Sequence, residues 1–213
     1  MTGDPLSDED IERGRHLFAQ SCDFAFAAGS QASMPPASLP EVAFAGRSNV
    51  GKSSLLNALT GRNALARVSR TPGRTKEINF FDLGGKLFLV DLPGYGYAKV
   101  SHRQSETWNK LIRSYLRGRP TLKRVCVLVD ARHGLKESDK AVMDLLDGAA
   151  MSYQIVLTKA DEASREELAR VVVATAREAA KHGAAHPVLL ETSSLTGMGI
   201  PALRAMLAQL ADP

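Results

Sequence analysis

The chain contains little cysteine and no long apolar run. Its 213 residues include two cysteines, Cys22 and Cys126, whose spacing fits neither a disulfide framework nor a metal site. We therefore expect packed thiols in a reducing, cytoplasmic setting. No window approaches about eighteen uninterrupted apolar residues, so we expect no membrane-spanning helix. The start of the chain is acidic, which does not fit a secretory signal.

Aromatic residues are also scarce, at 6% of the chain, and no RRM, KH or zinc-finger signature is present. Any contact with RNA should therefore be made to phosphate rather than by base stacking. Hydrophobic residues make up 44%, which is enough for a full core. We expect residues 1–40 to form a helix near 8–20, capped by Ser7 and Asp10, and a Pro/Ser-rich linker over 29–40. A single domain should cover residues 41–213.

Apolar runs alternate with helical patterns from residue 41 onward. This alternation predicts a doubly wound α/β fold with a mostly parallel sheet of about six or seven strands and helices on both faces. Gly84-Gly85 should form a hairpin turn between two of the strands. The expected strands are 41–45, 77–82, 86–91, 123–129, 153–158 and 187–191, and the expected helices after the first are the one that begins near residue 52, 105–117, 138–148, 163–182 and 199–210.

A phosphate-binding pattern, G-x-x-x-x-G-K-[ST], lies between the first expected strand and helix. Its glycines allow backbone N–H groups to curl around a polyphosphate at a helix N-terminus. Lys52 can reach the β- and γ-phosphates, and the Ser53 hydroxyl can ligate Mg²⁺. The alternative is a plain Gly-rich turn at a helix start. The residues are Gly46, Arg47, Ser48, Asn49, Val50, Gly51, Lys52, Ser53 and the following Ser54.

A second motif, Thr158-Lys159-Ala160-Asp161, follows a strand-like run and fits the [NT]KxD element that reads guanine. Guanine presents N1–H and an N2 amino group as adjacent donors, and the Asp161 carboxylate can accept from both. Adenine lacks both donors and would leave this carboxylate unpaired. The stem of Lys159 can lie along the base plane.

Two weaker elements complete the set. Asp91-Leu92-Pro93-Gly94 is a DxxG after a buried strand, in which Asp91 can hold Mg²⁺ through water and the Gly94 N–H can sense the γ-phosphate. Thr192-Ser193-Ser194 lies where a loop can touch guanine O6 through its backbone. Each follows the end of an expected strand, and doubly wound sheets bind ligands at that edge.

In this order the motifs resemble a translation-factor-type GTPase. More narrowly, the chain resembles the EngB/YihA/YsxC family of bacterial ribosome-biogenesis GTPases over roughly residues 16–210. The segments that carry the resemblance are Gly46–Asn57, Thr71–Thr75, Asn79-Phe80, Asp91–Ala98 and Asp130–Gly134.

The resemblance implies further site residues. Either Thr71 or Thr75 could complete the Mg²⁺ shell, and the family pattern P-G-x-T favours Thr75, so Gly73, Arg74 and Thr75 are expected at the nucleotide. Lys52, Thr75 and Gly94 are the expected catalytic groups. The position after DxxG, where many GTPases use Gln, is Tyr95. Hydrolysis should therefore be slow without help from a partner or from K⁺ beside Asn49; alternatively, Asn49 only supports the turn.

Charge is unevenly distributed. Residues 41–130 carry 16 Lys/Arg against 6 Asp/Glu, although the whole chain has a net charge of only +4. This basic segment is either solvated surface or a face for RNA phosphates. Its members around the expected switch loops are Arg62, Arg67, Arg70, Arg74, Lys76, Lys99, Arg103, Lys110, Arg113, Arg117 and Arg119.

These patterns predict a monomeric Mg²⁺·GTP switch. By resemblance, its partner is the large ribosomal subunit or its rRNA, its loss impairs cell division and septation, and no membrane is involved. A non-enzymatic GTP-bound scaffold and a P-loop ATPase or small-molecule kinase are the alternatives. Asp161 argues against the ATPase or kinase.

Overall fold

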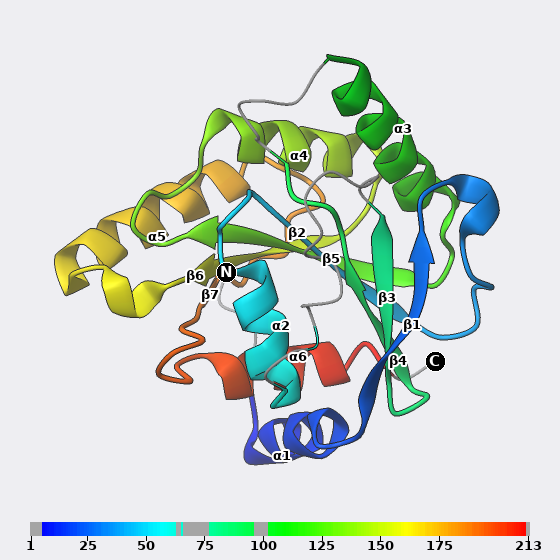
Figure 1. The fold of residues 1–213 in the computed structure, drawn as a ribbon. Helices are drawn as coiled ribbons and strands as arrows, with labels where there is room; N and C mark the ends of the chain where they lie inside the picture. Colours follow the sequence, from blue (N-terminus) through cyan, green and yellow to red (C-terminus); the bar gives the residue numbers. More distant parts are fainter. Residues whose placement is uncertain (1–5, 63–64, 66–76, 96–101, 212–213) are drawn as a thin grey trace.

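A computed structural model of the chain describes residues 6–62, 65, 77–95 and 102–211 (Figure 1). Seven strands form one sheet in the order β1-β3-β4-β2-β5-β6-β7. The strands are β1 (Cys22–Ala28), β2 (Glu41–Gly46), β3 (Ile78–Leu83), β4 (Leu87–Asp91), β5 (Leu122–Asp130), β6 (Tyr153–Thr158) and β7 (Leu190–Glu191). The helices are α1 (Asp8–Phe18), η1 (Gln31–Ser33), α2 (Lys52–Thr60), α3 (His102–Gly118), α4 (Glu137–Gly148), η3 (Ala160–Glu162), α5 (Arg165–Ala179) and α6 (Ile200–Ala208).

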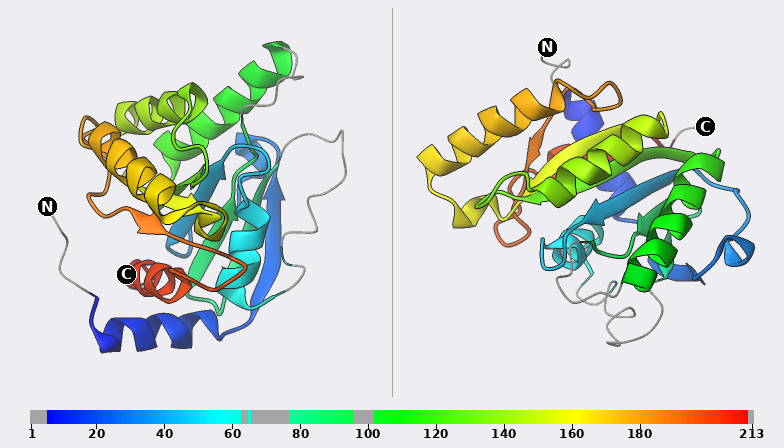
Figure 2. Two further views of the ribbon diagram at one scale, coloured as in Figure 1. Left: turned by 90° about the vertical axis from the view of Figure 1, so that its left-hand side faces the viewer. Right: turned by 90° about the horizontal axis from the view of Figure 1, so that it is seen from above.

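The predicted doubly wound architecture is confirmed. Strands β4, β2, β5, β6 and β7 pair in parallel, and β3 pairs antiparallel with β4 through the expected Gly84-Gly85 turn, where both glycines have positive φ. Side chains of α3, α4 and α5 pack on one face of the sheet, and those of α1, α2 and α6 pack on the other. Figure 2 shows these two helix layers on either side of the sheet.

The N-terminal segment packs against the same sheet. Ser7 and Asp10 form the expected capping box of α1, and the close approach of Gly14 to the Ala205 backbone packs α1 on α6. Strand β1 was not expected, and it pairs antiparallel with β3 at the edge of the sheet. Strand β1 therefore belongs to the sheet of the domain, although it lies before residue 41, where we expected the domain to begin.

The segment 29–40 is fixed to the sheet by a buried ion pair. Glu41 is fully buried and accepts hydrogen bonds from Tyr115 (2.8 Å), Thr121 (2.7 Å) and Arg119 (2.7 Å). Arg119 also donates to the carbonyl of Pro35 at 2.6 Å. Because these groups come from β2, α3 and the turn before β5, they hold together the end of the sheet opposite the phosphate-binding pattern of residues 46–53.

Helix α5 and strand β7 are shorter than the expected 163–182 and 187–191 for local reasons. Helix α5 begins at Arg165 because Ser164 caps it, accepting from the Glu167 N–H. Strand β7 is only two residues long, and the segment before it contains Pro187, which has no N–H to donate. Both cysteines are free and buried, and burial raises the pKa of each thiol to about 12. Among the described helices, none has the length and apolar character needed to span a bilayer.

Candidate nucleotide site

The P-loop connects the end of β2 to the start of α2. Gly51 has a φ of 102° and Asn49 a φ of 64°, so the chain turns through left-handed conformations that Gly and Asn tolerate best. A side chain at Gly46 would lie 2.7 Å from the Val50 side chain, so the close turn also requires glycine there. Ser53 and Ser54 follow Lys52 in the first turn of α2, with Ser53 partly exposed.

The residues Asp91-Leu92-Pro93-Gly94, here called the Asp91 loop, run beside the P-loop. The Leu92 N–H donates to Phe44, and the Tyr95 N–H donates to the carbonyl of Gly46 at 3.3 Å. In return the Ser48 N–H donates to the carbonyl of Tyr95 at 3.2 Å. Pro93 and Gly94 lie between these bonds, which hold the loop against the first turn of the P-loop.

Lys52 forms an ion pair with the Asp91 carboxylate. Both side chains are largely buried, with 14% and 5% of their surfaces exposed. Each of these buried charges is compensated by the other.

The Thr158–Asp161 motif is attached directly to the P-loop. The Thr158 hydroxyl donates to the Val50 carbonyl at 2.6 Å, and Lys159 Nζ donates to the Asn49 carbonyl at 2.8 Å. Lys159 has a φ of 57°, which turns the chain from β6 into η3. Ala160 is buried, and Asp161 beside it is exposed at the same edge of the sheet.

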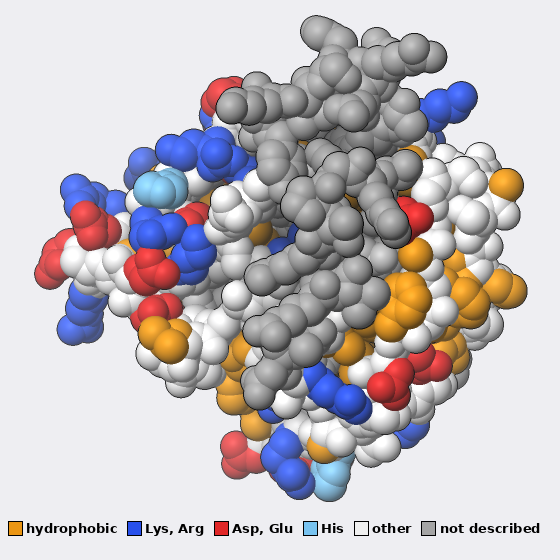
Figure 3. Space-filling model, in the orientation of Figure 1, with side chains coloured by type: hydrophobic (Ala, Val, Ile, Leu, Met, Phe, Trp, Pro, Cys, Tyr) orange, Lys and Arg blue, Asp and Glu red, His pale blue; other side chains and the backbone are white. Residues whose placement is uncertain are grey.

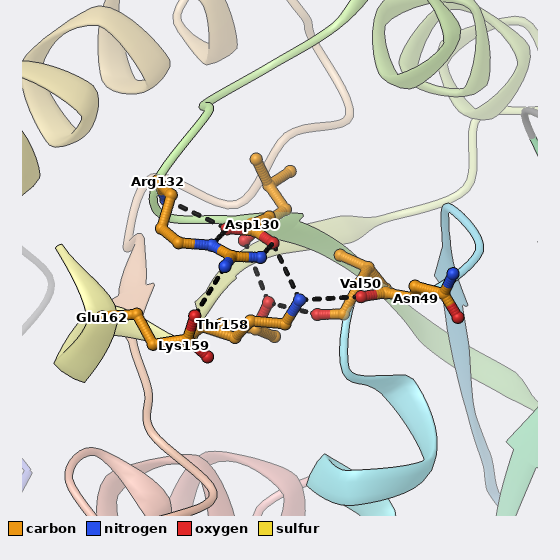
Figure 4. Close-up of polar contacts among 8 residues, drawn as sticks. Asn49, Val50, Asp130, Arg132, Thr158, Lys159 and Glu162 are labelled. Atoms are coloured by element: carbon orange, nitrogen blue, oxygen red, sulfur yellow. Dashed lines mark hydrogen bonds and ion pairs between the residues drawn. The ribbon is translucent and has the colours of Figure 1, made fainter.

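A network that the sequence analysis did not assign supports Lys159 (Figure 4). Asp130 ends β5 and accepts a hydrogen bond from Lys159 Nζ at 2.9 Å. It also accepts from Arg132 Nε at 2.9 Å and Nη2 at 2.7 Å, while Arg132 reaches Glu162 at 2.6 Å. Burial opposes ionisation of Asp130, but the hydrogen bonds from Arg132 and Lys159 outweigh it and hold its pKa well below the usual range. The sequence signal that could have identified Asp130 is its place at the end of β5, the parallel strand next to β6.

The Thr192-Ser193-Ser194 loop is tied to β6. The Thr192 N–H and hydroxyl both donate to the Leu157 carbonyl, at 2.7 and 2.8 Å, and the Thr192 carbonyl accepts from the Ala160 N–H at 3.1 Å. The buried Ser193 hydroxyl accepts from the N–H groups of Leu195 and Thr196. These side chains are used to shape the loop, so any contact to a base would come from its backbone or from Ser194.

Tyr95 turns away from the phosphate-binding edge. Its hydroxyl donates to Asp139 Oδ1 at 2.9 Å on α4, and both residues are buried. Burial, followed by the charge of Asp139, raises the Tyr95 pKa well above its ordinary value. Burial also raises the pKa of Asp139. The ring therefore anchors the Asp91 loop to α4.

Several predicted site residues lie outside the described part of the chain. These are Thr71, Gly73, Arg74 and Thr75, so the assignment of Thr75 to Mg²⁺ stays a prediction. Arg67, Arg70, Lys76 and Lys99 of the basic segment also lie outside it.

Among the described basic residues, one was wrongly included in the expected RNA-facing surface. Arg119 is 8% exposed and pairs with Glu41, so it is unavailable to a partner. Counting charges along the sequence could not show this pairing, because Glu41 is far from Arg119 in the sequence. Lys110, Arg113 and Arg117 are exposed on α3. Figure 3 shows one face of the surface: Lys and Arg gather with Asp and Glu on the side of α5, and hydrophobic side chains lie on the side of β1 and β3, where Phe24 and Phe26 are exposed.

Comparisons with known proteins place this site in a family. A family model described as "50S ribosome-binding GTPase" matches residues 41–159. A probable GTP-binding protein EngB from Hyphomonas neptunium is 58% identical over 97% of this chain and 95% of its own length. Its counterpart from Rhodospirillum rubrum is 54% identical over 99% of this chain and 96% of its own length. The chain belongs to the EngB family of GTP-binding proteins.

Solved structures agree on the fold. A crystal structure of a probable GTP-binding protein EngB superposes with a TM-score of 0.64 at 21% identity, covering 80% of this chain and 98% of that one. An Aquifex aeolicus Era variant bound to GDP and AlF₄⁻ gives 0.59 at 18% identity, covering 81% of this chain and 57% of that one. Membership of the family makes the chain a GTPase that binds GTP and GDP, which excludes the ATPase or kinase alternative.

Proposed function

We propose that this GTPase is a cytoplasmic, monomeric switch that assists assembly of the large ribosomal subunit and is thereby needed for normal division and septation. The observation that carries the proposal is the meeting of the P-loop, the Asp91 loop and the base-reading loop at one sheet edge, in a chain whose family model is named for binding the 50S ribosome. The description of the family model supports the ribosomal partner, and the arrangement of the three loops supports a nucleotide switch.

The donor set fits Mg²⁺ held mainly through phosphate. Among the described residues no cluster of three or more His, Cys, Asp or Glu could cage a metal. Mg²⁺ is usually bound by one or two protein oxygens together with substrate phosphates and water. The Ser53 hydroxyl and the buried Asp91 carboxylate lie at the ends of neighbouring elements, and Thr75 is the third proposed ligand. When bound, the ion neutralises charge on the phosphate oxygens.

Each part of the site then has a distinct task. Lys52 exchanges its Asp91 partner for the β- and γ-phosphates, and backbone N–H groups of residues 46–54 surround the phosphates. Asp161 accepts from guanine, Lys159 lies along the base, and the backbone near Ser194 faces O6. Gly94 and Thr75 touch the γ-phosphate, so hydrolysis removes the group that both of them sense.

The proposed partner-binding face includes the exposed cations of α3. The basic segment 41–130 contains the described Lys110, Arg113 and Arg117 on α3, and α3 follows the Asp91 loop in the chain. A positive surface of this kind binds RNA phosphates with a steep salt dependence. Nucleotide state and salt should therefore both control binding to the ribosomal subunit.

The test is binding of the full chain to purified large-subunit particles with GDP, GTP or a β,γ-imido GTP analogue, over a series of salt concentrations. We expect tighter binding with the analogue than with GDP, and weaker binding as salt rises. Lys52→Ala should abolish the nucleotide response. The triple change of Lys110, Arg113 and Arg117 to Glu should impair particle binding but leave GDP binding intact. Particle binding that ignores nucleotide and salt would contradict the proposal.

A further inference from the structure

A groove lined by three arginines lies where the C-terminal ends of α1 and α2 meet α6. It has a volume of about 460 Å³ and is open to solvent, and its cations are Arg15 of α1, Arg62 just after α2 and Arg204 of α6. Its described lining contains no Asp or Glu. Figure 1 shows the end of α2 above α1, and Figure 3 shows Lys and Arg side chains, with Asp and Glu beside them, over α1. The groove is therefore a cationic hollow at the end of α2 away from the P-loop.

Arg204 is held in place by the last turn of α2 and by α1. Its Nε donates to the Leu59 carbonyl at 2.9 Å, and its Nη2 donates to the Ala58 carbonyl at 3.0 Å. The guanidinium also lies over the Phe18 ring, 5.9 Å from the ring centre. Burial lowers the pKa of Arg204, and no carboxylate of the described residues forms an ion pair that would oppose this effect. Buried charges are usually paired, so this cation can take an anionic partner from the groove.

The other two cations are exposed and have only weak acidic partners. Arg15 pairs with Glu12 at 2.6 Å, but 58% and 51% of these side chains are exposed. Arg62 lies 3.7 Å from Asp23, again with both side chains largely exposed and at a distance too long for a hydrogen bond. Exposed ion pairs of this kind contribute little to stability. A phosphate can therefore replace either carboxylate, and the guanidinium fork matches two phosphate oxygens.

We propose that this groove binds the phosphate backbone of RNA, as a contact separate from the cations of α3. A free phosphate ion is usually enclosed by backbone N–H groups, whereas the ends of α1 and α2 present carbonyl groups. An open groove with cations from three elements instead suits a chain of phosphates that passes along it. The choice of RNA as the polyanion rests on the proposed function; the groove as an anion site does not.

The position of the groove separates it from the nucleotide switch. Helix α2 has nine residues, so the groove lies about 13 Å along the helix from the P-loop. None of the predicted nucleotide-binding residues is part of its described lining. Binding of RNA in the groove should therefore be the same with GDP as with the β,γ-imido GTP analogue. It should also be independent of RNA sequence, because contacts to phosphate do not read bases.

The test compares the full wild-type chain with the double variant Arg15→Gln, Arg62→Gln. Arg204 is left unchanged because its loss would also remove the hydrogen bonds at the end of α2. The matched control is Arg170→Gln, Arg177→Gln, which removes the same charge from exposed positions on α5, on the other face of the sheet. The probe is a fluorescein-labelled single-stranded RNA of mixed sequence, about 20 nucleotides long, whose binding is followed by anisotropy over a salt series.

We expect the groove variant to bind this RNA about tenfold more weakly than wild type, the effect of losing charged hydrogen bonds. The slope of log affinity against log salt should fall in magnitude by about 1.4, because two phosphate contacts of about 0.7 each are lost. Both effects should appear equally with GDP and with the analogue. The α5 control should stay within about twofold of wild type, and GDP affinity and the thermal midpoint should be unchanged in both variants.

One arm of the experiment distinguishes RNA from a free phosphate ion. Inorganic phosphate replaces chloride at constant ionic strength, and we expect no added competition with RNA. Competition by phosphate that disappears in the groove variant would make the groove a small-anion site and overturn the proposal. Absence of RNA binding by wild type, equal affinity in the groove variant, an equal loss in the α5 control, or a groove effect confined to one nucleotide would overturn it as well. A groove effect on RNA together with ribosomal-particle binding that ignores nucleotide would contradict only the proposed function.

Discussion

Asp130 offers the sharpest test of how Lys159, which is proposed to lie along the base, is held. Asp130→Asn keeps the shape of the side chain and removes its charge. The carboxylate now accepts from Lys159 Nζ at 2.9 Å and from two nitrogens of Arg132, and its side chain is 11% exposed. An Asn in its place would turn its NH₂ toward one of these two cations, so at least one charged hydrogen bond is lost.

The expected size of the effect follows from what remains. A hydrogen bond to a charged group contributes about 1.5–3 kcal/mol. Lys159 keeps its bond to the Asn49 carbonyl at 2.8 Å, so the lower end applies, and GDP affinity should fall about tenfold. Isothermal titration or fluorescent-GDP displacement measures this directly.

A double-mutant cycle identifies the route of the effect. If Asp130 acts through Lys159, adding Asp130→Asn to Lys159→Ala should cost nothing further. Arg132→Gln is the control, because it leaves the Asp130–Lys159 pair in place and Arg132 is more exposed, at 36%. Its effect on GDP affinity should be within about threefold, as for exposed ion pairs. GDP affinity of Asp130→Asn within about twofold of wild type, or full additivity with Lys159→Ala, would refute the reasoning.

The same carboxylate should affect acid stability. Its pKa is lower in the folded chain than in the unfolded chain, where Asp titrates near about 3.9. The stabilisation is therefore present above that value and is lost as the pH falls through it toward the folded pKa. Between about pH 5 and pH 2 the wild-type chain should lose more unfolding free energy than Asp130→Asn, as measured by urea unfolding.

Three further outcomes are expected. Asp161→Asn should make the chain prefer xanthosine triphosphate over GTP, because xanthine has an acceptor where guanine has a donor. If a competition assay shows an unchanged preference for GTP, Asp161 does not read the base. The rate of GTP hydrolysis should rise when K⁺ replaces Na⁺, and this rise should be absent in Asn49→Gly, a variant whose glycine tolerates the φ of 64° at this position. Equal rates in both salts would argue against a cation at Asn49. Glu41→Ala should lower the unfolding free energy by about 3–5 kcal/mol, because it leaves Arg119 buried without its carboxylate partner. The control, Glu12→Ala at an exposed position, should leave the unfolding free energy nearly unchanged. A loss below about 1 kcal/mol in Glu41→Ala would contradict the account of the buried pair.

Local sequence patterns predicted the parallel core of the fold but not its edge. Strands β2, β5 and β6 are buried over most of their length, so their apolar runs are continuous and easy to recognise. Strand β1 lies at the edge, with Phe24 and Phe26 exposed and its register broken between them. Its pairing depends on β3, whose paired residues lie 50 to 61 positions further along the chain, and no local pattern reports such a partner.

The candidate site shows the same division. The P-loop and the Thr158–Asp161 motif carry their chemistry in consecutive residues, so their spacing identifies them. Asp130 and Asp139 act on residues from other elements, Lys159 and Tyr95, and only the folded chain brings these pairs together. Arg119 was included in the basic surface because the charges along a sequence do not show which of them are buried.

The Tyr95–Asp139 contact limits how hydrolysis can be assisted. Swinging Tyr95 toward the phosphates would break a buried 2.9 Å hydrogen bond and leave the Asp139 side chain without that donor. Leaving a buried polar group unpaired costs about 1–3 kcal/mol, and more for a charged one. The ring also packs in the core beside Leu92 and Ile112, so the motion would open a void. Tyr95 is therefore better suited to holding Gly94 in place than to orienting the attacking water.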